Sequence, residues 1–194
     1  MCILFIGCTK DEQTTNIYGI VQDHTTDALI PGATVYLFGH EKGGGLFGGG
    51  ASFFIDSTYT DTDGTFYFSP EDNDELGYSC MAFKDLYIAS QEFTANSPMG
   101  THNYGVTVKM YPIAWLQLHI KSINTYAPSD HISIGLLCNG GFYGETDTTV
   151  ITGVNGNFDI TVSWFLYVGG EQVETGAEEV YCPAFDTTYQ EILY

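Results

Sequence analysis

The sequence contains no arginine, and the only side chains that are positively charged at neutral pH are those of five lysines. Twenty-four carboxylates oppose them, which gives a formal net charge of −19. Nucleic-acid binding depends on Lys and Arg side chains that neutralise phosphates, so this charge excludes a nucleic-acid partner. It also excludes electrostatic attachment to anionic lipid headgroups, because such attachment needs a basic surface.

Long apolar stretches and helical patterning are missing as well. No segment approaches the ~20 apolar residues of a transmembrane helix, and apolar stripes at helical spacing are nearly absent. In their place stand 14 tyrosines and 13 phenylalanines among many β-branched residues, which favour strands. Short alternating runs separated by turn residues therefore predict an all-β chain of two antiparallel β-sandwich domains in tandem.

Motifs for catalysis and for metal binding are also absent. The five histidines stand in no His-Glu-x-x-His arrangement, and there is no Gly-x-Ser-x-Gly motif. We therefore expect no catalytic residues, no enzymatic activity, and neither a metal nor a cofactor. The one weak candidate for a cation site falls short of a calcium loop, because the first and twelfth positions of that loop would be Tyr59 and Pro70. Its acidic residues are Asp61, Asp63 and Asp72.

Strands are predicted wherever alternating side chains run between turn residues. Asp63-Gly64, Asn139-Gly140-Gly141, Asn155-Gly156 and Gly169-Gly170 predict hairpin turns, because these turns need residues that tolerate a positive φ. We expect a first domain over residues 16–110 and a second, smaller β-sandwich over residues 111–194. The predicted strands are 17–22, 33–38, 52–59, 65–68, 78–83, 87–93, 104–110, 115–120, 131–137, 149–152, 157–167 and 186–194.

The amino-terminal residues form an apolar run, Ile3-Leu4-Phe5-Ile6-Gly7, that ends at Cys8, and Lys10-Asp11-Glu12 follows. The run resembles a bacterial lipobox, and the charged triplet resembles the export signal of Bacteroidota-type surface lipoproteins. The resemblance implies a signal-peptide remnant at 1–7, a covalent lipid on Cys8 and a lipidated linker at 8–15. It also implies a lipid anchor in the outer membrane, facing the cell surface. The alternative is an apolar first strand with a buried Cys8.

Three segments of the first domain follow one another in an informative order: Ile17–Asp23, Ile30–Leu37 and Thr60–Phe68. Together they resemble the carboxypeptidase-regulatory-like domain, a transthyretin-like (prealbumin-type) β-sandwich. The resemblance covers residues 16–110, although Lys84–Tyr87 departs from the Gly-Tyr pair that often closes this region in the family. It implies a folding or contact module that accompanies enzymes and transporters and has no peptidase activity of its own.

Two further predictions concern loops and cysteines. Glycines on both sides of Leu46-Phe47 would hold this apolar pair in solvent, which predicts a partner contact; a mobile hairpin loop is the alternative. Cys138 and Cys182 each stand beside a turn and could form a disulfide in an oxidising envelope. Two buried free thiols are the alternative. Cys80 is expected to face the core of its strand.

Two functional hypotheses follow. The first is a non-enzymatic surface lipoprotein that serves as an interaction subunit of an outer-membrane transporter or assembly machine, with an outer-membrane protein as its partner. The alternative is a structural or adhesive surface protein, such as a fimbrillin-like subunit, or a glycan-binding module. Fimbrillin-like subunits commonly mature by cleavage after arginine, and the lack of arginine argues against that route here.

Overall fold

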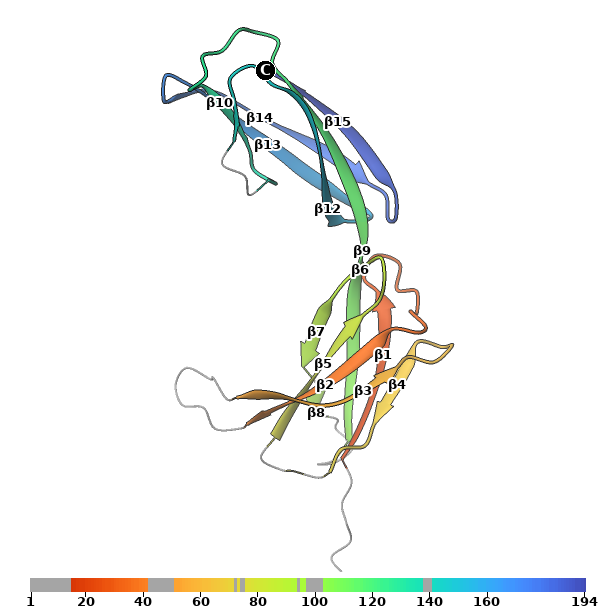
Figure 1. The fold of residues 1–194 in the computed structure, drawn as a ribbon. Coiled ribbons are helices and arrows are strands. Elements are labelled where there is room, and N and C mark those ends of the chain that lie inside the picture. The colour runs from red at the N-terminus through yellow and green to blue at the C-terminus, as the bar shows by residue number, and fades with distance from the viewer. Residues whose placement is uncertain are drawn as a thin grey trace, which may run out of the picture. The chain divides into compact units, whose positions relative to one another are not determined.

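A computed structural model describes residues 15–41, 51–71, 73, 76–93, 95–96, 103–137 and 141–194. These residues form fifteen strands and no helix (Figure 1), which confirms the all-β class. No part of the described chain makes a helix of the length and apolarity that crossing a membrane requires.

The chain divides into two compact units. Unit 1 lies within Met1–Asp85 and Ala89–Met110, and unit 2 consists of Leu86–Ile88 and Tyr111–Tyr194. Strand β9 (Asn103–Lys121) contributes its first residues to unit 1 and the remainder to unit 2.

Unit 1 contains two sheets, because alternate residues of its strands are apolar and turn toward a shared core. One sheet contains β4, β1, β9 and β8, and the other has the order β3-β2-β5-β7. Its core includes Val35 and Leu37 on β2 and Val108 on β9, all fully buried. The bounds of the other strands are β1 (Asn16–Asp23), β2 (Thr34–Glu41), β3 (Ser52–Tyr59), β4 (Thr65–Phe68), β5 (Leu76–Phe83), β7 (Ser90–Phe93) and β8 (Ala95–Asn96).

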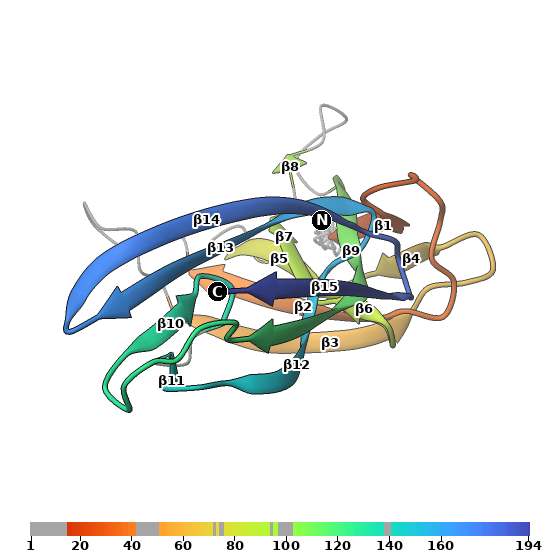
Figure 2. The same cartoon turned by 90° about the horizontal axis from the view of Figure 1, so that it is seen from above.

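Unit 2 also contains two sheets, and Figure 2 shows them from above. In the first, β9 lies between β12 and β15 and also pairs with β6; the second has the order β11-β10-β13-β14. Leu116, Leu118 and Ile120 of β9 and Ile132 of β10 are fully buried in the shared core. The bounds are β6 (Tyr87–Ile88), β10 (His131–Ile134), β11 (Phe142–Tyr143), β12 (Asp147–Asn155), β13 (Phe158–Val168), β14 (Glu171–Cys182) and β15 (Thr187–Leu193).

Strand β9 corrects the prediction of two separate strands at 104–110 and 115–120, since it is continuous through Pro112. A proline in a strand costs one ladder donor, so it is tolerated where no donor is needed. Pairing with β1 ends at Met110, and pairing with β12 begins at Ile113. Pro112 lies between these two ladders, and its carbonyl accepts a 2.7 Å hydrogen bond from the amide of Gly156.

Two of the four predicted hairpins are wrong. A third, Asn139-Gly140-Gly141, extends outside the described residues and stays a prediction. Gly64 has the expected positive φ of 67°, but β3 and β4 on either side of it belong to different sheets. Asn155-Gly156 likewise connects β12 and β13, which do not pair with each other. Gly169-Gly170 is a true two-residue hairpin, because β13 and β14 pair directly and both glycines have positive φ. A turn residue thus fixes a change of direction without fixing the partner strand.

Candidate functional site on strand β9

The first and the last described strands share one neighbour. β1 pairs in parallel with β9 over eight residue pairs, from Asn16–Asn103 to Asp23–Met110. β15 pairs in parallel with the other end of β9 over seven pairs, from Trp115–Thr187 to Lys121–Leu193. Strand β9 therefore holds a terminal strand in each unit, in both cases by a parallel ladder.

The alternation of apolar residues places one face of each of the three strands, β1, β9 and β15, against a core. Ile17 and Val21 on β1 are fully buried, as is Val108 on β9. On β15, Ile192 is buried against the core that contains Leu118. Since a slip of one residue would expose each of these faces, burial fixes the register of both ladders.

Hydrogen bonds beyond the paired residues extend both ladders. In unit 1, the amide of His24 donates to the carbonyl of Met110 at 2.9 Å. In unit 2, the amide of Trp115 donates to the carbonyl of Asp186 at 3.0 Å, and the amide of Tyr194 donates to the carbonyl of Lys121 at 3.1 Å. Both terminal strands are thus bonded to β9 over their whole length.

A polar cluster ties the three strands of the first sheet of unit 2 together on its outer face. His119 of β9 places Nε2 at 2.7 Å from Oδ1 of Asp147 on β12 and Nδ1 at 3.0 Å from Oε1 of Glu191 on β15. The same Nδ1 lies 3.1 Å from the hydroxyl of Tyr189 on β15. Lys121 of β9 donates through Nζ to Oδ2 of Asp147 at 2.8 Å. We call these five residues the His119 cluster.

The charges in this cluster reinforce one another. The hydrogen bond to Asp147 raises the pKa of His119, with a further contribution from Glu191, while partial desolvation opposes both. The hydrogen bonds from Lys121 and His119 lower the pKa of Asp147. When the imidazole is protonated, both ring nitrogens can donate, and His119 then links β12 and β15 through β9. Nowhere in the described ranges do three His, Cys, Asp or Glu side chains lie so that they could hold a metal ion.

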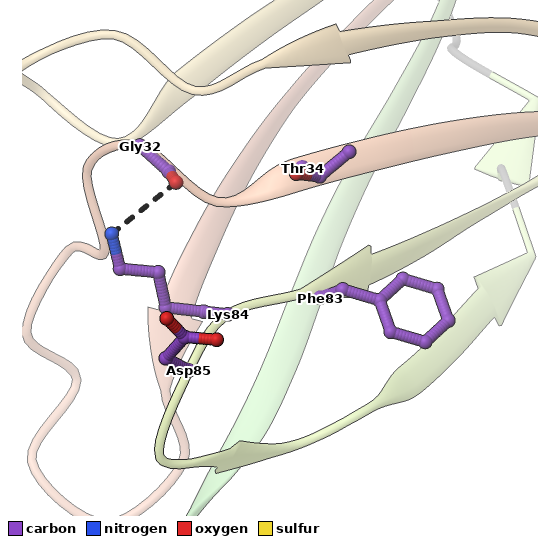
Figure 3. A pocket seen from close by; sticks show the side chains of 5 residues that line it. All are labelled: Gly32, Thr34, Phe83, Lys84 and Asp85. Carbon is purple, nitrogen blue, oxygen red and sulfur yellow. Dashed lines mark hydrogen bonds between the residues drawn. The ribbon is translucent and has the colours of Figure 1, made fainter.

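Unit 1 has an open cleft of about 310 Å³ beside the turn that precedes β2 (Figure 3). In it, Lys84 Nζ donates to the carbonyl of Gly32 at 3.2 Å, while the ring of Phe83 is 42% exposed. One carboxylate, that of Asp85, and one ammonium group line this cleft. The ammonium group in this cleft therefore holds the backbone of the turn that precedes β2.

The predicted cation candidates occupy a turn. Oδ1 of Asp61 accepts hydrogen bonds from the amides of Asp63 and Thr65, both at 2.9 Å, and Oδ2 accepts one from the Thr65 hydroxyl at 2.8 Å. These bonds to Thr65 lower the pKa of Asp61. The Asp61 carboxylate thus stabilises its own turn. Asp72 lies outside the described residues, so a cation site that includes it stays a prediction.

Most other predicted site residues lie outside the described ranges: Cys8, Lys10, Asp11, Glu12, Leu46, Phe47 and Cys138. Cys182 is buried in unit 2, but its proposed disulfide partner is not described, so this pairing also stays a prediction. Cys80 faces the core as expected, and burial raises the pKa of its thiol to about 12.

The two ladders and the His119 cluster were not predicted from the sequence. Asp147 and Glu191 lie 28 and 72 residues from His119 along the chain, so no local spacing brings them together. The one available signal is the alternation of His119 and Lys121 on a single face of a predicted strand. That signal marks an outward-facing polar stripe without naming its partners.

No protein-family model matches the sequence, and no curated protein matches it either. The resemblance of residues 16–110 to the carboxypeptidase-regulatory-like domain therefore stays a hypothesis.

Some solved structures are similar. The shaft pilin SpaA of Lactobacillus rhamnosus GG gives a TM-score of 0.36 at 11% identity, covering 93% of this chain and 97% of that one. GBS52, the minor pilin of Streptococcus agalactiae, gives 0.39 at 11%, covering 92% and 94%. The Bacillus anthracis TIE protein gives 0.39 at 10%, covering 93% of this chain and 34% of that one, so the chain spans about a third of its length. With TM-scores below 0.5, these similarities do not extend beyond the β-rich class.

Proposed function

We propose that this is a non-enzymatic structural protein of the cell surface that carries tension between its two ends through β9. The observation that supports the proposal is the parallel pairing of both β1 and β15 with this one strand. Of the two hypotheses drawn from the sequence, this pairing favours the structural or adhesive protein over the accessory subunit of a transporter.

In unit 1, the direction of the strands decides how tension acts. Tension would enter at Asn16, the start of β1, and leave at Met110, where β9 passes out of the unit. Because β1 and β9 are parallel neighbours, these two points lie at opposite ends of the ladder. Pulling them apart slides one strand along the other and loads all ladder bonds together. Each such bond contributes about 1 kcal/mol, and the ladder fails only when many break at once.

Unit 2 repeats the arrangement. Tension would enter at Tyr111 and leave at Tyr194, beyond the end of β15. β9 and β15 are again parallel neighbours, so these points also lie at opposite ends of a ladder. An accessory subunit that only contacts a partner has no need for this geometry in either unit, whereas a tether needs it in both.

The proposed location follows from the anchor predicted by the sequence. A lipid on Cys8, exported with the help of Lys10-Asp11-Glu12, would hold the chain to the outer membrane just before β1 begins. The anchor would then lie at the end of β1 that tension pulls. Leu46 and Phe47 stay the proposed contact with an outer-membrane or neighbouring protein partner.

Single-molecule force spectroscopy on the whole chain tests this function. With handles at both chain ends, we expect two separate unfolding events, one for each unit, each sudden and at high force. Gradual extension at low force in either unit would contradict the proposal, because it would mean that the terminal strand peels away pair by pair.

A further inference from the structure

The free edges of the sheets differ in how they are protected. An unpaired strand edge invites another strand, and proteins discourage this with short strands, charges or bulges. In unit 1, β4 and β7 have only four residues each, while β3 carries Asp56 and a register shift opposite Leu37 and Phe38. Each of these edges has at least one protective feature.

In unit 2, the long edge strand β14 carries four glutamates, Glu171, Glu174, Glu178 and Glu179. The other edge of that sheet is the two-residue β11. In the sheet that contains β9, one edge strand is β15, which carries Glu191 and is bonded from Thr188 to the carbonyl of Tyr181 on β14 at 3.3 Å. These edges are therefore charged, short or bonded to the facing sheet.

The edge strands β6 and β8 have only two residues each. The last edge strand among the described residues, β12, is long and carries a charge only at its first residue. It is nine residues long, and its residues 148–155 include no charged residue and no proline. Thr148 to Thr152 are all β-branched, which favours an extended strand. Asp147, its only charged residue, is already bonded to His119 and Lys121. Within the described ranges, β12 pairs with β9 alone and ends its sheet (Figure 2).

Hydrogen bonds around β9 show which residues of β12 face the open edge. Ile113 donates to the carbonyl of Leu86 and accepts from the amide of Phe185, and Trp115 donates to Asp186, so odd-numbered residues of β9 bond away from β12. Pairs such as Leu118–Val150 then supply the bonds between β9 and β12, because bonded and non-bonded pairs alternate in an antiparallel ladder.

The odd-numbered residues of β12 consequently turn both their backbone groups toward the open edge and their side chains toward solvent. Ile151, at the middle of the strand, is 60% exposed. Thr149 and Gly153 on either side of it are also exposed.

We propose that β12 pairs with β12 of a second copy of this chain, in antiparallel orientation about a two-fold axis at Ile151. This centre gives the longest ladder that the exposed edge allows. Ile151 would face the same residue of the second copy, Thr149 would face Gly153 of the partner subunit, and Asp147 would face Asn155 of the partner subunit. No like charges meet along this ladder.

Net charge explains why β12, rather than β14 or β15, would pair with a second copy of the chain. Two chains of net charge −19 repel each other, and pairing at β14 or β15 would add glutamates at short range. Among the edge strands of the described ranges, only β12 offers a long ladder without that cost. Salt screens the general repulsion and leaves the ladder itself unaffected, so added salt should strengthen the dimer.

Sedimentation velocity of the whole chain, from micromolar to near-millimolar concentration, tests the pairing. We expect the sedimentation coefficient to rise from the monomer value to the dimer value, at lower protein concentration when salt is added. Ile151→Lys and Thr149→Lys should each shift the transition at least tenfold toward higher concentration. Val173→Lys, at a 56%-exposed position on β14, is the matched control and should leave it unchanged or strengthen it.

A wild-type chain that stays monomeric throughout would overturn the proposal. So would a dimer that survives both lysine substitutions on β12, since pairing would then occur elsewhere. Circular dichroism of each variant establishes that it is folded, as expected for substitutions at exposed positions. The outcome is independent of the proposed tension-bearing role, because neither ladder of β9 involves the open edge of β12.

Discussion

Gly19 is required by its neighbour rather than by its own backbone. It pairs with Phe66 across β1 and β4, and the ring of Phe66 occupies the space that a Cβ at position 19 would need. A glycine inside a strand often marks a bend or bulge, but the β1 ladders show no register shift at Gly19. Close packing of a ring over glycine is a tertiary contact and leaves no local mark in the sequence.

Gly19→Ala should therefore destabilise unit 1 by about 1–3 kcal/mol through overpacking. Urea unfolding gives the free energy. Gly105→Ala on β9 is the control, since no heavy atom lies within 4 Å of a Cβ built there. It should be neutral or stabilising by up to about 1 kcal/mol, because alanine loses less backbone entropy than glycine on folding. Equal losses in both variants would contradict the packing explanation.

The thiol of Cys80 should be inert in the folded protein. Burial excludes reagents and raises its pKa to about 12, so almost no thiolate is present at neutral pH. Alkylation followed by mass spectrometry should find Cys80 unmodified in buffer and modified in urea. Modification in buffer at the rate of an unfolded peptide would show that β5 opens readily.

At the scale of elements, the ladder between β15 and β9 depends on alternate amides. The carbonyl of Asp186 and the amide of Tyr194 both bond to β9. Since the backbone groups of every second residue in a strand face the same neighbour, the amide of Gln190 faces β9 as well. Gln190→Pro removes this donor and should cost about 1–3 kcal/mol of unit 2 stability. Gln190→Ala keeps the donor and loses only the side-chain bonds to Glu178 and to the carbonyl of Glu191, so thermal unfolding should separate the two variants.

The His119 cluster should make the attachment of β15 pH-dependent. The folded-state pKa of His119 is raised, so its contribution to stability is fully present below the unfolded pKa of about 6.5 and is lost as the pH rises through the folded value. The pKa of Asp147 is lowered, so its contribution is lost only as the pH falls below about 4. The cluster thus stabilises unit 2 most between these limits.

His119→Gln should accordingly lower the thermal midpoint of unit 2 at pH 5.5 and change it far less at pH 9. Glutamine preserves hydrogen bonding without the titrating charge. A midpoint lowered equally at both pH values would mean that the imidazole acts by packing alone.

Element boundaries were largely predictable, and the exceptions have physical causes. The strands at 52–59 and 65–68 match β3 and β4, because aromatic and β-branched residues that favour strands run there between turn residues. β14 was missed since its glutamates and exposed residues show no apolar face over most of its length. β9 was divided in two because a proline inside a strand normally ends it.

At the scale of the whole molecule, the two-ladder site could not be predicted. Alternation reports which side chain faces a core, but it does not report which strand lies beside which. β1 and β9 are separated by most of unit 1 along the chain. The turn residues Asp63-Gly64 moreover predicted that β3 pairs with β4, and these two strands belong to different sheets. Which strands pair depends on how much apolar surface all the strands of the two sheets bury together, and this quantity is known only from the folded structure.

The direction of force on unit 1 tests the tension-bearing role most directly. Handles at the two chain ends load β1 against β9 in shear, whereas handles at the amino end and at Ser69 pull β1 and β4 apart from one end of their antiparallel pair. Unit 1 should unfold at several-fold higher force with the first placement than with the second. Equal forces for the two placements would contradict a mechanical role for the β1–β9 ladder.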